Sequence, residues 1–113
     1  MAQNAPSSFI QPGGANLVTD GGTMATYDVT AAKVIKATPG RLCKFIIVTV
    51  GTAGSAWQFN DCTTTGAAAA ANEIFTIGAT TAAGTVVTLD WPCEAGIVLS
   101  AVPTNGVCSV SWS

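Results

Sequence analysis

The side chains with the greatest scope for chemistry in this chain are four cysteines and six carboxylates. Zinc sites in proteins use cysteine and histidine at short spacings, but this chain has no CxxC pair and no histidine. The cysteines allow three disulfide pairings, and the sequence does not choose among them. We expect reduced thiols that act as small buried apolar groups, with a disulfide or a reactive thiol as the alternatives. They are Cys43, Cys62, Cys93 and Cys108.

The carboxylates offer one candidate pair, Asp90 and Glu94, on either side of Trp91-Pro92-Cys93. Hydrolysis of a glycosidic bond needs two carboxylates across a cleft of sugar size, and nothing in the pattern indicates a cleft. The lack of histidine removes most triad and general-base designs, and no G-x-S-x-G or phosphate-loop pattern occurs. We therefore expect no enzyme, and no catalytic, cofactor-binding or metal-binding residues.

The composition is poor in charge. Charged residues make up 9% of the chain, whereas typical soluble domains have about 25%. Solvated monomers usually keep a charged surface of mixed sign, so this composition predicts a surface largely covered by partners. A neutral secreted domain rich in threonine and serine is the alternative. Four basic against six acidic residues disfavours nucleic acid, and no apolar run of about 20 residues predicts a membrane span.

Residues 26–113 read as one β domain. Seven or eight short alternating segments are separated by turn signals roughly every 8–12 residues, and no segment has a convincing helical period. This spacing predicts an all-β fold, a single β-sandwich of antiparallel strands that is jelly-roll-like. The segment 61–72, with its run of alanines, is expected to form a helical turn or a small-residue loop.

The centre of the predicted domain is residues 33–50. Pro39-Gly40 is a turn signal, so residues 33–38 and 42–50 are expected to form a hairpin. From Phe45 onward both faces of the second strand are largely apolar, which predicts a strand covered on both sides. Pro92 is expected to end the strand over residues 85–91, because proline cannot donate to a ladder.

Residues 1–25 are expected to form an extended N-terminal arm, because proline and glycine interrupt every possible element there. We hypothesise that the arm docks on neighbouring subunits; a disordered tail, or packing along its own sandwich, is the alternative. The segment has no secretory signal, so synthesis without export is expected. Its predicted interface anchors are Phe9, Ile10, Leu17, Val18 and Met24.

Two further groups have competing interpretations. The basic residues either protect an exposed strand edge from stray pairing or align the domain against an acidic patch on a partner. The tryptophans Trp57, Trp91 and Trp112 favour core packing, with an interface or a sugar-binding platform as alternatives. The basic cluster comprises Lys33, Lys36, Arg41 and Lys44.

Several pieces of the chain resemble small proteins encoded in the structural gene clusters of tailed phages and prophages. These pieces are KVIKATPGRL at 33–42, the alanine-containing segment 61–72, LDWP at 89–92 followed by GIV at 96–98, and the serine-rich segment 107–113. The similarity covers roughly residues 30–113 and leaves the arm unmatched. The four cysteines are a departure from the group.

The resemblance implies a capsid cement or decoration protein. Such proteins sit on the outside of an icosahedral shell as β-sandwich dimers or trimers, so the implied partners are the major capsid protein and further copies of this chain. The implied location is the outer capsid surface of the virion, after synthesis in the host cytoplasm. The family has no catalytic residues to carry over. The alternatives are a phage tail or fibre module, or a lectin-like glycan-binding domain.

Overall fold

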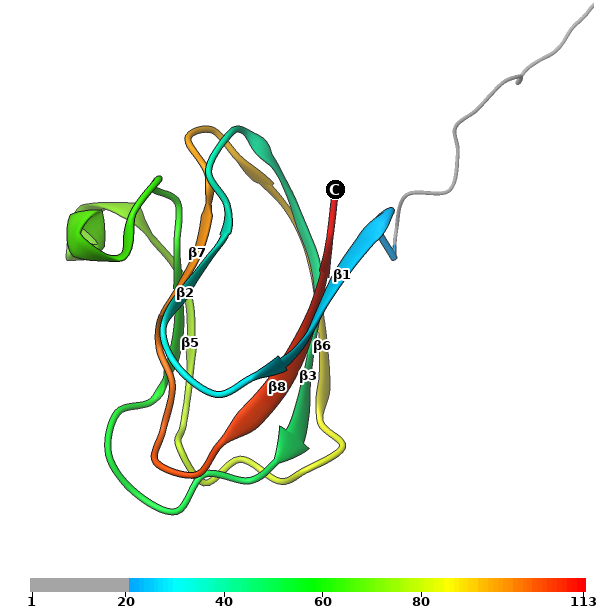
Figure 1. The fold of residues 1–113 in the computed structure, drawn as a ribbon, viewed down its shortest axis with the longest axis vertical. Helices are drawn as coiled ribbons and strands as arrows, with labels where there is room; N and C mark the ends of the chain where they lie inside the picture. The colour runs from blue at the N-terminus through cyan, green and yellow to red at the C-terminus, as the bar shows by residue number, and fades with distance from the viewer. Residues whose placement is uncertain (1–20) are drawn as a thin grey trace, which may run out of the picture.

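The computed structural model describes residues 21–113, which form eight strands in two antiparallel sheets packed face to face (Figure 1). One sheet has the order β1-β8-β3-β6 and the other the order β2-β7-β4-β5. Two short 3₁₀ turns, η1 (Thr65–Ala67) and η2 (Ala70–Asn72), interrupt the segment between β4 and β5. The strands are β1 (Met24–Val29), β2 (Lys33–Lys36), β3 (Gly40–Thr49), β4 (Trp57–Asn60), β5 (Glu73–Ile77), β6 (Val86–Cys93), β7 (Ile97–Ala101) and β8 (Val107–Trp112).

The all-β sandwich expected from the sequence is confirmed. The strand pairs are nested: β1 pairs with β8, β2 with β7, β3 with β6 and β4 with β5. Two further pairings, β3 with β8 and β4 with β7, join these pairs into sheets. We interpret this nesting, a long antiparallel hairpin rolled into two layers, as jelly-roll-like.

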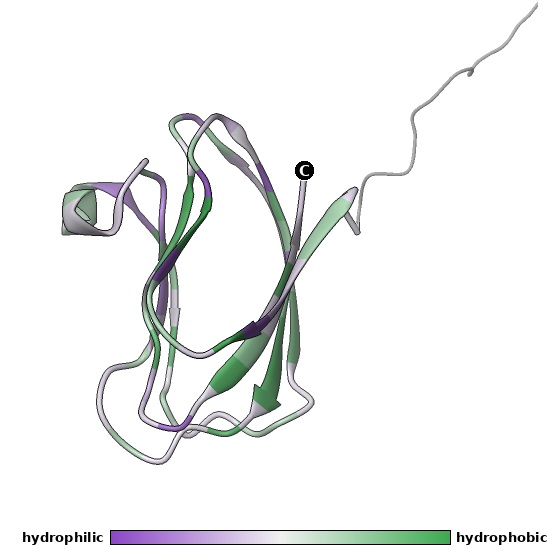
Figure 2. Cartoon of the chain, in the orientation of Figure 1, coloured by the Kyte–Doolittle hydropathy of each residue, from purple (hydrophilic) through white to green (hydrophobic). Residues whose placement is uncertain are grey.

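The core lies between the two sheets and is built around Phe45 of β3. Its ring meets those of Trp57 and Phe59 edge-on, each at 5.3 Å between centroids, and that of Phe75 at 6.4 Å. All but Phe75 are fully buried. The most hydrophobic stretches of the ribbon lie on β3, β7 and β8, which are inner strands of their sheets (Figure 2).

The predicted hairpin over residues 33–50 is wrong. β2 belongs to one sheet, where it pairs with β7, and β3 belongs to the other, where it pairs with β6 and β8. Pro39-Gly40 is therefore a corner between sheets. A Cβ on Gly40 would collide with the carbonyl oxygen of Ser113, so glycine permits close backbone approach there. Local turn chemistry indicated the change of direction but not the change of sheet.

Pro92 does not end its strand, contrary to expectation. It lies inside β6, where it faces Arg41 of β3. β6 is an edge strand of its sheet, so the missing N–H of proline can face away from the ladder, as it does on edge strands generally. The expectation failed because strand order, which decides what proline can tolerate, is a tertiary property.

The outward side of β3 is not covered within residues 21–113. Ile46 is 38% exposed and Val48 is 53% exposed, although β3 is an inner strand. The inward residues Phe45 and Ile47 are fully buried, as the alternation predicts. Residues 21–113 therefore do not provide the double covering expected for this strand.

The four edge strands each carry a feature that hinders pairing with another strand. β1 has a bulge between Thr26 and Val29 with Asp28 at φ 54°, and β6 has its proline and a register shift opposite β3. β2 is four residues long and carries two lysines, whereas β5 is five residues long and begins with a glutamate. Bulges, proline, charge and shortness are the usual protections of sheet edges.

Candidate interaction surface

The outer faces of the two sheets differ in how the chain covers them. On the β2-β7-β4-β5 sheet, residues 61–72 fold back outside the strands, and η1 contacts β7 (Figure 1). Val98, which alternates with the core residues Ile97 and Leu99, is fully buried beneath this cover. The other sheet keeps several large apolar side chains exposed on its outer face. The sandwich therefore has one closed face and one open face.

The closed face depends on a buried polar network at Asn60, which is fully buried. Its side-chain oxygen accepts hydrogen bonds from Gln58 at 3.0 Å and Ser100 at 2.5 Å. Its side-chain nitrogen donates to the carbonyl oxygen of Ala69 at 2.9 Å and to the Asn72 side chain at 2.7 Å. Each hydrogen-bonding position of the amide is used, so the segment 61–72 is held in one conformation.

Asp61 fixes the other end of this segment. Its carboxylate accepts backbone N–H groups from Glu94 at 2.8 Å, Ala95 at 2.8 Å and Gly96 at 3.2 Å, in the turn between β6 and β7. Desolvation alone would raise the pKa of Asp61, but the three donors outweigh it and hold the pKa below its ordinary value. The carboxylate thus joins the covering segment to the neighbouring turn.

We call the outward surface of the β1-β8-β3-β6 sheet the open face. Its residues lie in rows across the strands: Ile46 faces Val86 on one side and Ser109 on the other, and Lys44 faces Thr88 and Ser111 in the same way. Tyr27 is 74% exposed at the β1 edge, and Val86 is 54% exposed at the β6 edge. The open face comprises Ala25, Tyr27, Lys44, Ile46, Val48, Val86, Thr88, Ser109 and Ser111.

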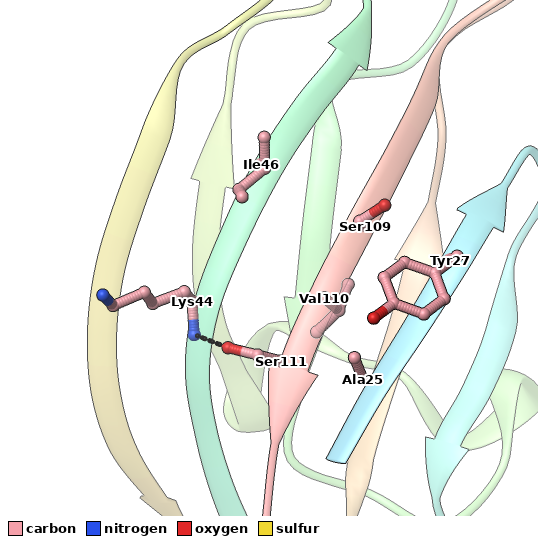
Figure 3. A pocket seen from close by; sticks show the side chains of 7 residues that line it. All are labelled: Ala25, Tyr27, Lys44, Ile46, Ser109, Val110 and Ser111. Atoms are coloured by element: carbon pink, nitrogen blue, oxygen red, sulfur yellow. Dashed lines mark hydrogen bonds between the residues drawn. The ribbon is translucent and has the colours of Figure 1, made fainter. Parts of the chain in front are cut away.

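A shallow groove runs along β8 on the open face. Ser109 and Ser111 are small, whereas Tyr27 on β1 and Ile46 on β3 are large, so the serines form a floor between two walls (Figure 3). A pocket of about 120 Å³ lies in this groove. For comparison, an apolar cavity of about 150 Å³ can hold benzene. The pocket therefore has room for one apolar side chain of a partner.

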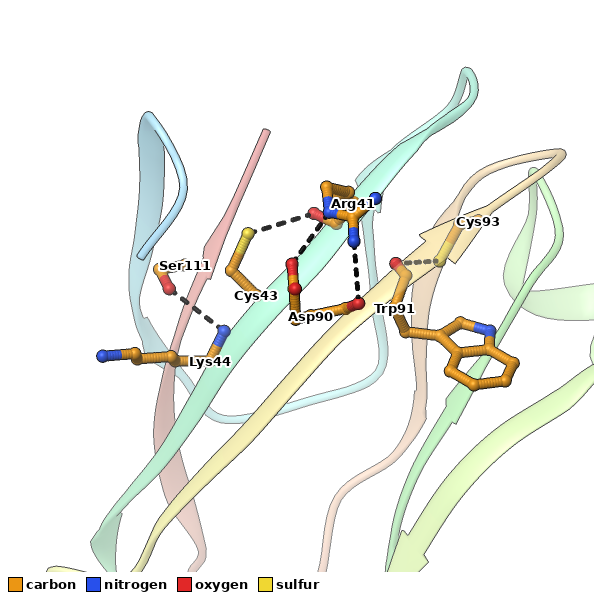
Figure 4. Close-up of polar contacts among 7 residues, drawn as sticks. All are labelled: Arg41, Cys43, Lys44, Asp90, Trp91, Cys93 and Ser111. Carbon is orange, nitrogen blue, oxygen red and sulfur yellow. Dashed lines mark hydrogen bonds and ion pairs between the residues drawn. The ribbon is translucent and has the colours of Figure 1, made fainter. Parts of the chain in front are cut away.

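The charges near the open face are few. Arg41 donates to the Asp90 carboxylate at 2.8 Å and to its carbonyl oxygen at 3.1 Å (Figure 4). The guanidinium holds the pKa of Asp90 below its ordinary value, and the pKa of Arg41 is raised in turn. Lys44 points away from β8 and toward β6 (Figure 3). The middle of the face is therefore left to apolar and hydroxyl groups.

The structure divides the predicted basic cluster between strands of the two sheets. Lys33 and Lys36 lie on β2 in one sheet, and Arg41 and Lys44 lie on β3 in the other. Lys36 places its ammonium 5.8 Å from the ring centre of Trp112, a cation–π contact. Since β2 is an edge strand, its two lysines suit the edge-protection interpretation.

Most of the predicted arm lies outside the described residues, including the anchors Phe9, Ile10, Leu17 and Val18. Met24, the last anchor, belongs to β1, where it pairs with Trp112 and is 53% exposed. The sheet therefore begins within the segment 1–25 that the sequence assigned to the arm.

The three tryptophans have different environments. Trp57 is fully buried in the core, Trp112 packs at its margin and donates to Thr26 at 3.0 Å, and Trp91 is 51% exposed. The core placement expected for all three is therefore wrong for Trp91, which stands on the irregular part of the β6 edge.

The four cysteines are buried, as expected from the sequence. Desolvation raises the pKa of Cys93 to about 11 and that of Cys108 to about 12. Both thiols are therefore protonated at neutral pH and are poor nucleophiles.

Sequence reasoning did not identify the open face as a site. The signal was present, because both sides of β3 are apolar and Ser109 and Ser111 alternate with Cys108 and Val110 in the sequence of β8. The sequence predicted a strand covered on both sides and did not say what covers it. Within residues 21–113, no group of three histidine, cysteine or acidic side chains could hold a metal ion, and no helix is long and apolar enough to cross a membrane.

Comparison with known proteins adds no relative: no family model, curated protein or solved structure matches the chain.

Proposed function

We propose that this chain is a non-enzymatic virion protein that binds the outside of an assembled phage capsid and stabilises it by bridging major capsid subunits. One observation carries the proposal: a β-sandwich in a chain with 9% charged residues exposes large apolar side chains, among them Tyr27, Ile46 and Val86, on one sheet face. Contiguous apolar surface on a small domain marks a place where another protein binds. The resemblance of residues 30–113 to phage structural proteins names the kind of assembly.

A cement protein of this kind needs no chemistry. It binds the assembled shell and not the free subunits, so each bound copy shifts the equilibrium toward the shell by mass action. Contacts to two subunits at once add multivalency, which raises the overall affinity without a new kind of contact. The N-terminal residues preceding Gly21 provide chain that can extend such a contact beyond the sandwich.

Co-sedimentation with emptied capsids of a phage that encodes the chain tests the proposal. The full chain should pellet with capsids and raise the temperature at which they expand or leak. A variant that lacks residues 2–20 keeps β1 intact and should bind more weakly. If capsids neither bind the full chain nor gain thermal stability from it, the proposal fails.

The exposed indole of Trp91 favours a second candidate, a glycan-binding module of a tail or fibre, because exposed aromatic side chains form platforms for sugars. A glycan array would show binding by the unmodified chain and its loss in Trp91→Ala. An empty array together with capsid binding would reject this candidate.

A further inference from the structure

We propose that residues 15–20 turn back at Gly21-Gly22 and seat the side chain of Leu17 in the groove along β8. The occupant of the groove is thus a segment of the same chain, and the groove fixes where the N-terminal arm leaves the sandwich. The inference is independent of the proposed function, since this contact forms within one chain whether or not that chain binds a capsid.

The start of β1 brings this segment close to the groove. The chain enters β1 through Gly21-Gly22, where Gly22 has φ 77° and lies so close to the backbone of Trp112 that a Cβ would collide with it. A glycine in the left-handed region is typical of a tight turn. The described residues therefore begin at a turn, beside the end of β8 and within a few residues of the groove.

The number of residues on each side of the turn selects Leu17. This residue precedes Gly21 by four positions, and Ala25, which lines the pocket in the groove, follows Gly21 by four. Extended chain advances about 3.3 Å per residue in both directions, so a reversal at this point returns Leu17 to the height of Ala25. Tyr27 and Ile46 then stand on either side of the leucine as walls (Figure 3).

The chain has two ways to return along β1, beside the edge of the strand or over its face. The edge carries a bulge between Thr26 and Val29, with Asp28 at φ 54°, which hinders pairing with a further strand. The face offers a groove between exposed apolar side chains. The return over the face is therefore favoured.

The pocket in the groove matches an aliphatic side chain. Its volume is about 120 Å³, and apolar atoms line almost all of it. An apolar cavity that holds benzene measures about 150 Å³, so the four side-chain carbons of leucine fit this pocket better than a phenyl ring does. The contact also covers part of Tyr27, which is 74% exposed in residues 21–113.

A tethered segment can fill so small a site where a separate molecule cannot. A pocket for one side chain gives a free partner little affinity, because association costs translational and rotational freedom. A segment that begins a few residues away is present at an effective concentration on the order of millimolar, which offsets that cost. The size of the pocket therefore favours the same chain as its occupant.

The charges and polar groups are compatible with this contact. Asp20 is the one charged side chain in residues 1–20, and Lys44 is the one charged residue among those that define the open face, so the two surfaces have opposite sign. The hydroxyl of Ser111 accepts the backbone N–H of Lys44 at 3.1 Å, and it can donate its own hydrogen to a carbonyl group of the seated segment. The contact therefore buries no opposing charge.

The rest of the arm extends past the sheet. Phe9 precedes Gly21 by twelve positions, or about 40 Å of extended chain, whereas the six residues of β1 span about 20 Å. Phe9 and Ile10 therefore reach beyond the end of the groove, where a neighbouring molecule can bind them. Val48 and Val86 are not part of the pocket lining, so the contact leaves a part of the open face for another protein.

Chymotrypsin tests the contact, because it cuts after leucine and phenylalanine and residues 1–20 contain one of each. Ser109→Trp fills the groove and should speed cleavage after Leu17 on the order of tenfold, because a seated segment is cut only when it leaves its site. Cleavage after Phe9 should not change. The matched control Thr76→Trp adds the same ring to an exposed position of β5 in the other sheet and should change neither rate.

A second measurement uses the unmodified chain and so does not depend on the folding of a variant. Nuclear Overhauser contacts should join the methyl groups of Leu17 to the ring of Tyr27. In a mixture of isotope-labelled and unlabelled chains, these contacts should appear within labelled chains and not between labelled and unlabelled chains. The mixture therefore separates a contact within one chain from an exchange of segments between copies.

The absence of a contact between Leu17 and Tyr27 in the unmodified chain would overturn the proposal, and so would a contact that appears only between chains. Equal rates of cleavage after Leu17 in the unmodified chain and in Ser109→Trp, with the sandwich of the variant shown intact by circular dichroism, would overturn it as well. None of these measurements involves a capsid, so their outcome is separate from that of the co-sedimentation experiment.

Discussion

Replacing Asp61 with asparagine should destabilise the sandwich strongly for so small a change. The carboxylate accepts three backbone N–H groups, from Glu94, Ala95 and Gly96, at 2.8, 2.8 and 3.2 Å. In Asp61→Asn one oxygen can still accept two of them, but the amide nitrogen would face the remaining N–H donor. The loss of charge and the conflict between donors affect a group that is partly exposed to water.

We work the magnitude from these contacts. Hydrogen bonds to a charged group contribute roughly 1.5–3 kcal/mol each and neutral ones about 1 kcal/mol, so the net loss, discounted for solvent, is about 1–2 kcal/mol. For a domain of this size, that lowers Tm by about 5–12 °C. The control Glu94→Gln removes an exposed carboxylate whose side chain takes no part in the contact.

The effect should also depend on pH in a defined direction. The pKa of Asp61 is lowered in the folded protein, so its contribution to stability is complete above the unfolded-state pKa of about 3.9. That contribution is lost as the pH falls through the lowered folded value. Urea unfolding of the unmodified protein and of Asp61→Asn, from pH 7 to pH 2.5, measures how the difference in their free energies of unfolding changes with pH. The reasoning would be refuted if the two free energies of unfolding were equal at pH 7. It would also be refuted if their difference were as large at pH 2.5 as at pH 7.

Four other outcomes are expected. Asn60→Ala should cost about 2–4 kcal/mol, because it leaves buried partners unsatisfied, and should speed hydrogen exchange in residues 61–72; slow exchange there would contradict the network. Phe45→Ala should cost about 3–5 kcal/mol in urea unfolding, with Phe45→Leu far milder; equal losses would contradict the aromatic cluster. Arg41→Ala should lower Tm only slightly, and 1 M salt should abolish the difference, because exposed ion pairs are screened. A thiol reagent at pH 8 should label the four cysteines only after unfolding, and rapid labelling of the native protein would contradict their burial.

The sequence was sufficient to predict the strands and the turns near them. The sequence of β8 alternates, and Cys108 and Val110 on one side of it are buried; Asn105-Gly106, a residue pair suited to turns, forms a turn with Asn105 at φ 64°. These features are local, since side-chain period and turn chemistry are set by neighbouring residues.

What could not be predicted depends on which strands become neighbours. Pro39-Gly40 indicates a turn whether the flanking strands form a hairpin in one sheet or lie in different sheets. Only the pairing of β2 with β7 places this turn at a corner between the sheets. The apolar outer side of β3 has the same pattern whether its cover comes from the same chain or from another. A sequence pattern of apolar residues indicates that a surface favours being covered. It does not indicate which segment or which protein covers it.

The bulges, proline, lysines and short lengths at the sheet edges have a consequence for the protein at high concentration. A chain produced in many copies with an unprotected strand edge would add further chains without limit and form fibres. Here Asp28 and Pro92 interrupt the long edges, so growth along the sheets is blocked while the flat side of one sheet stays accessible. Pairing along the sheet edges is the kind of association that does not saturate, and these edge features hinder it.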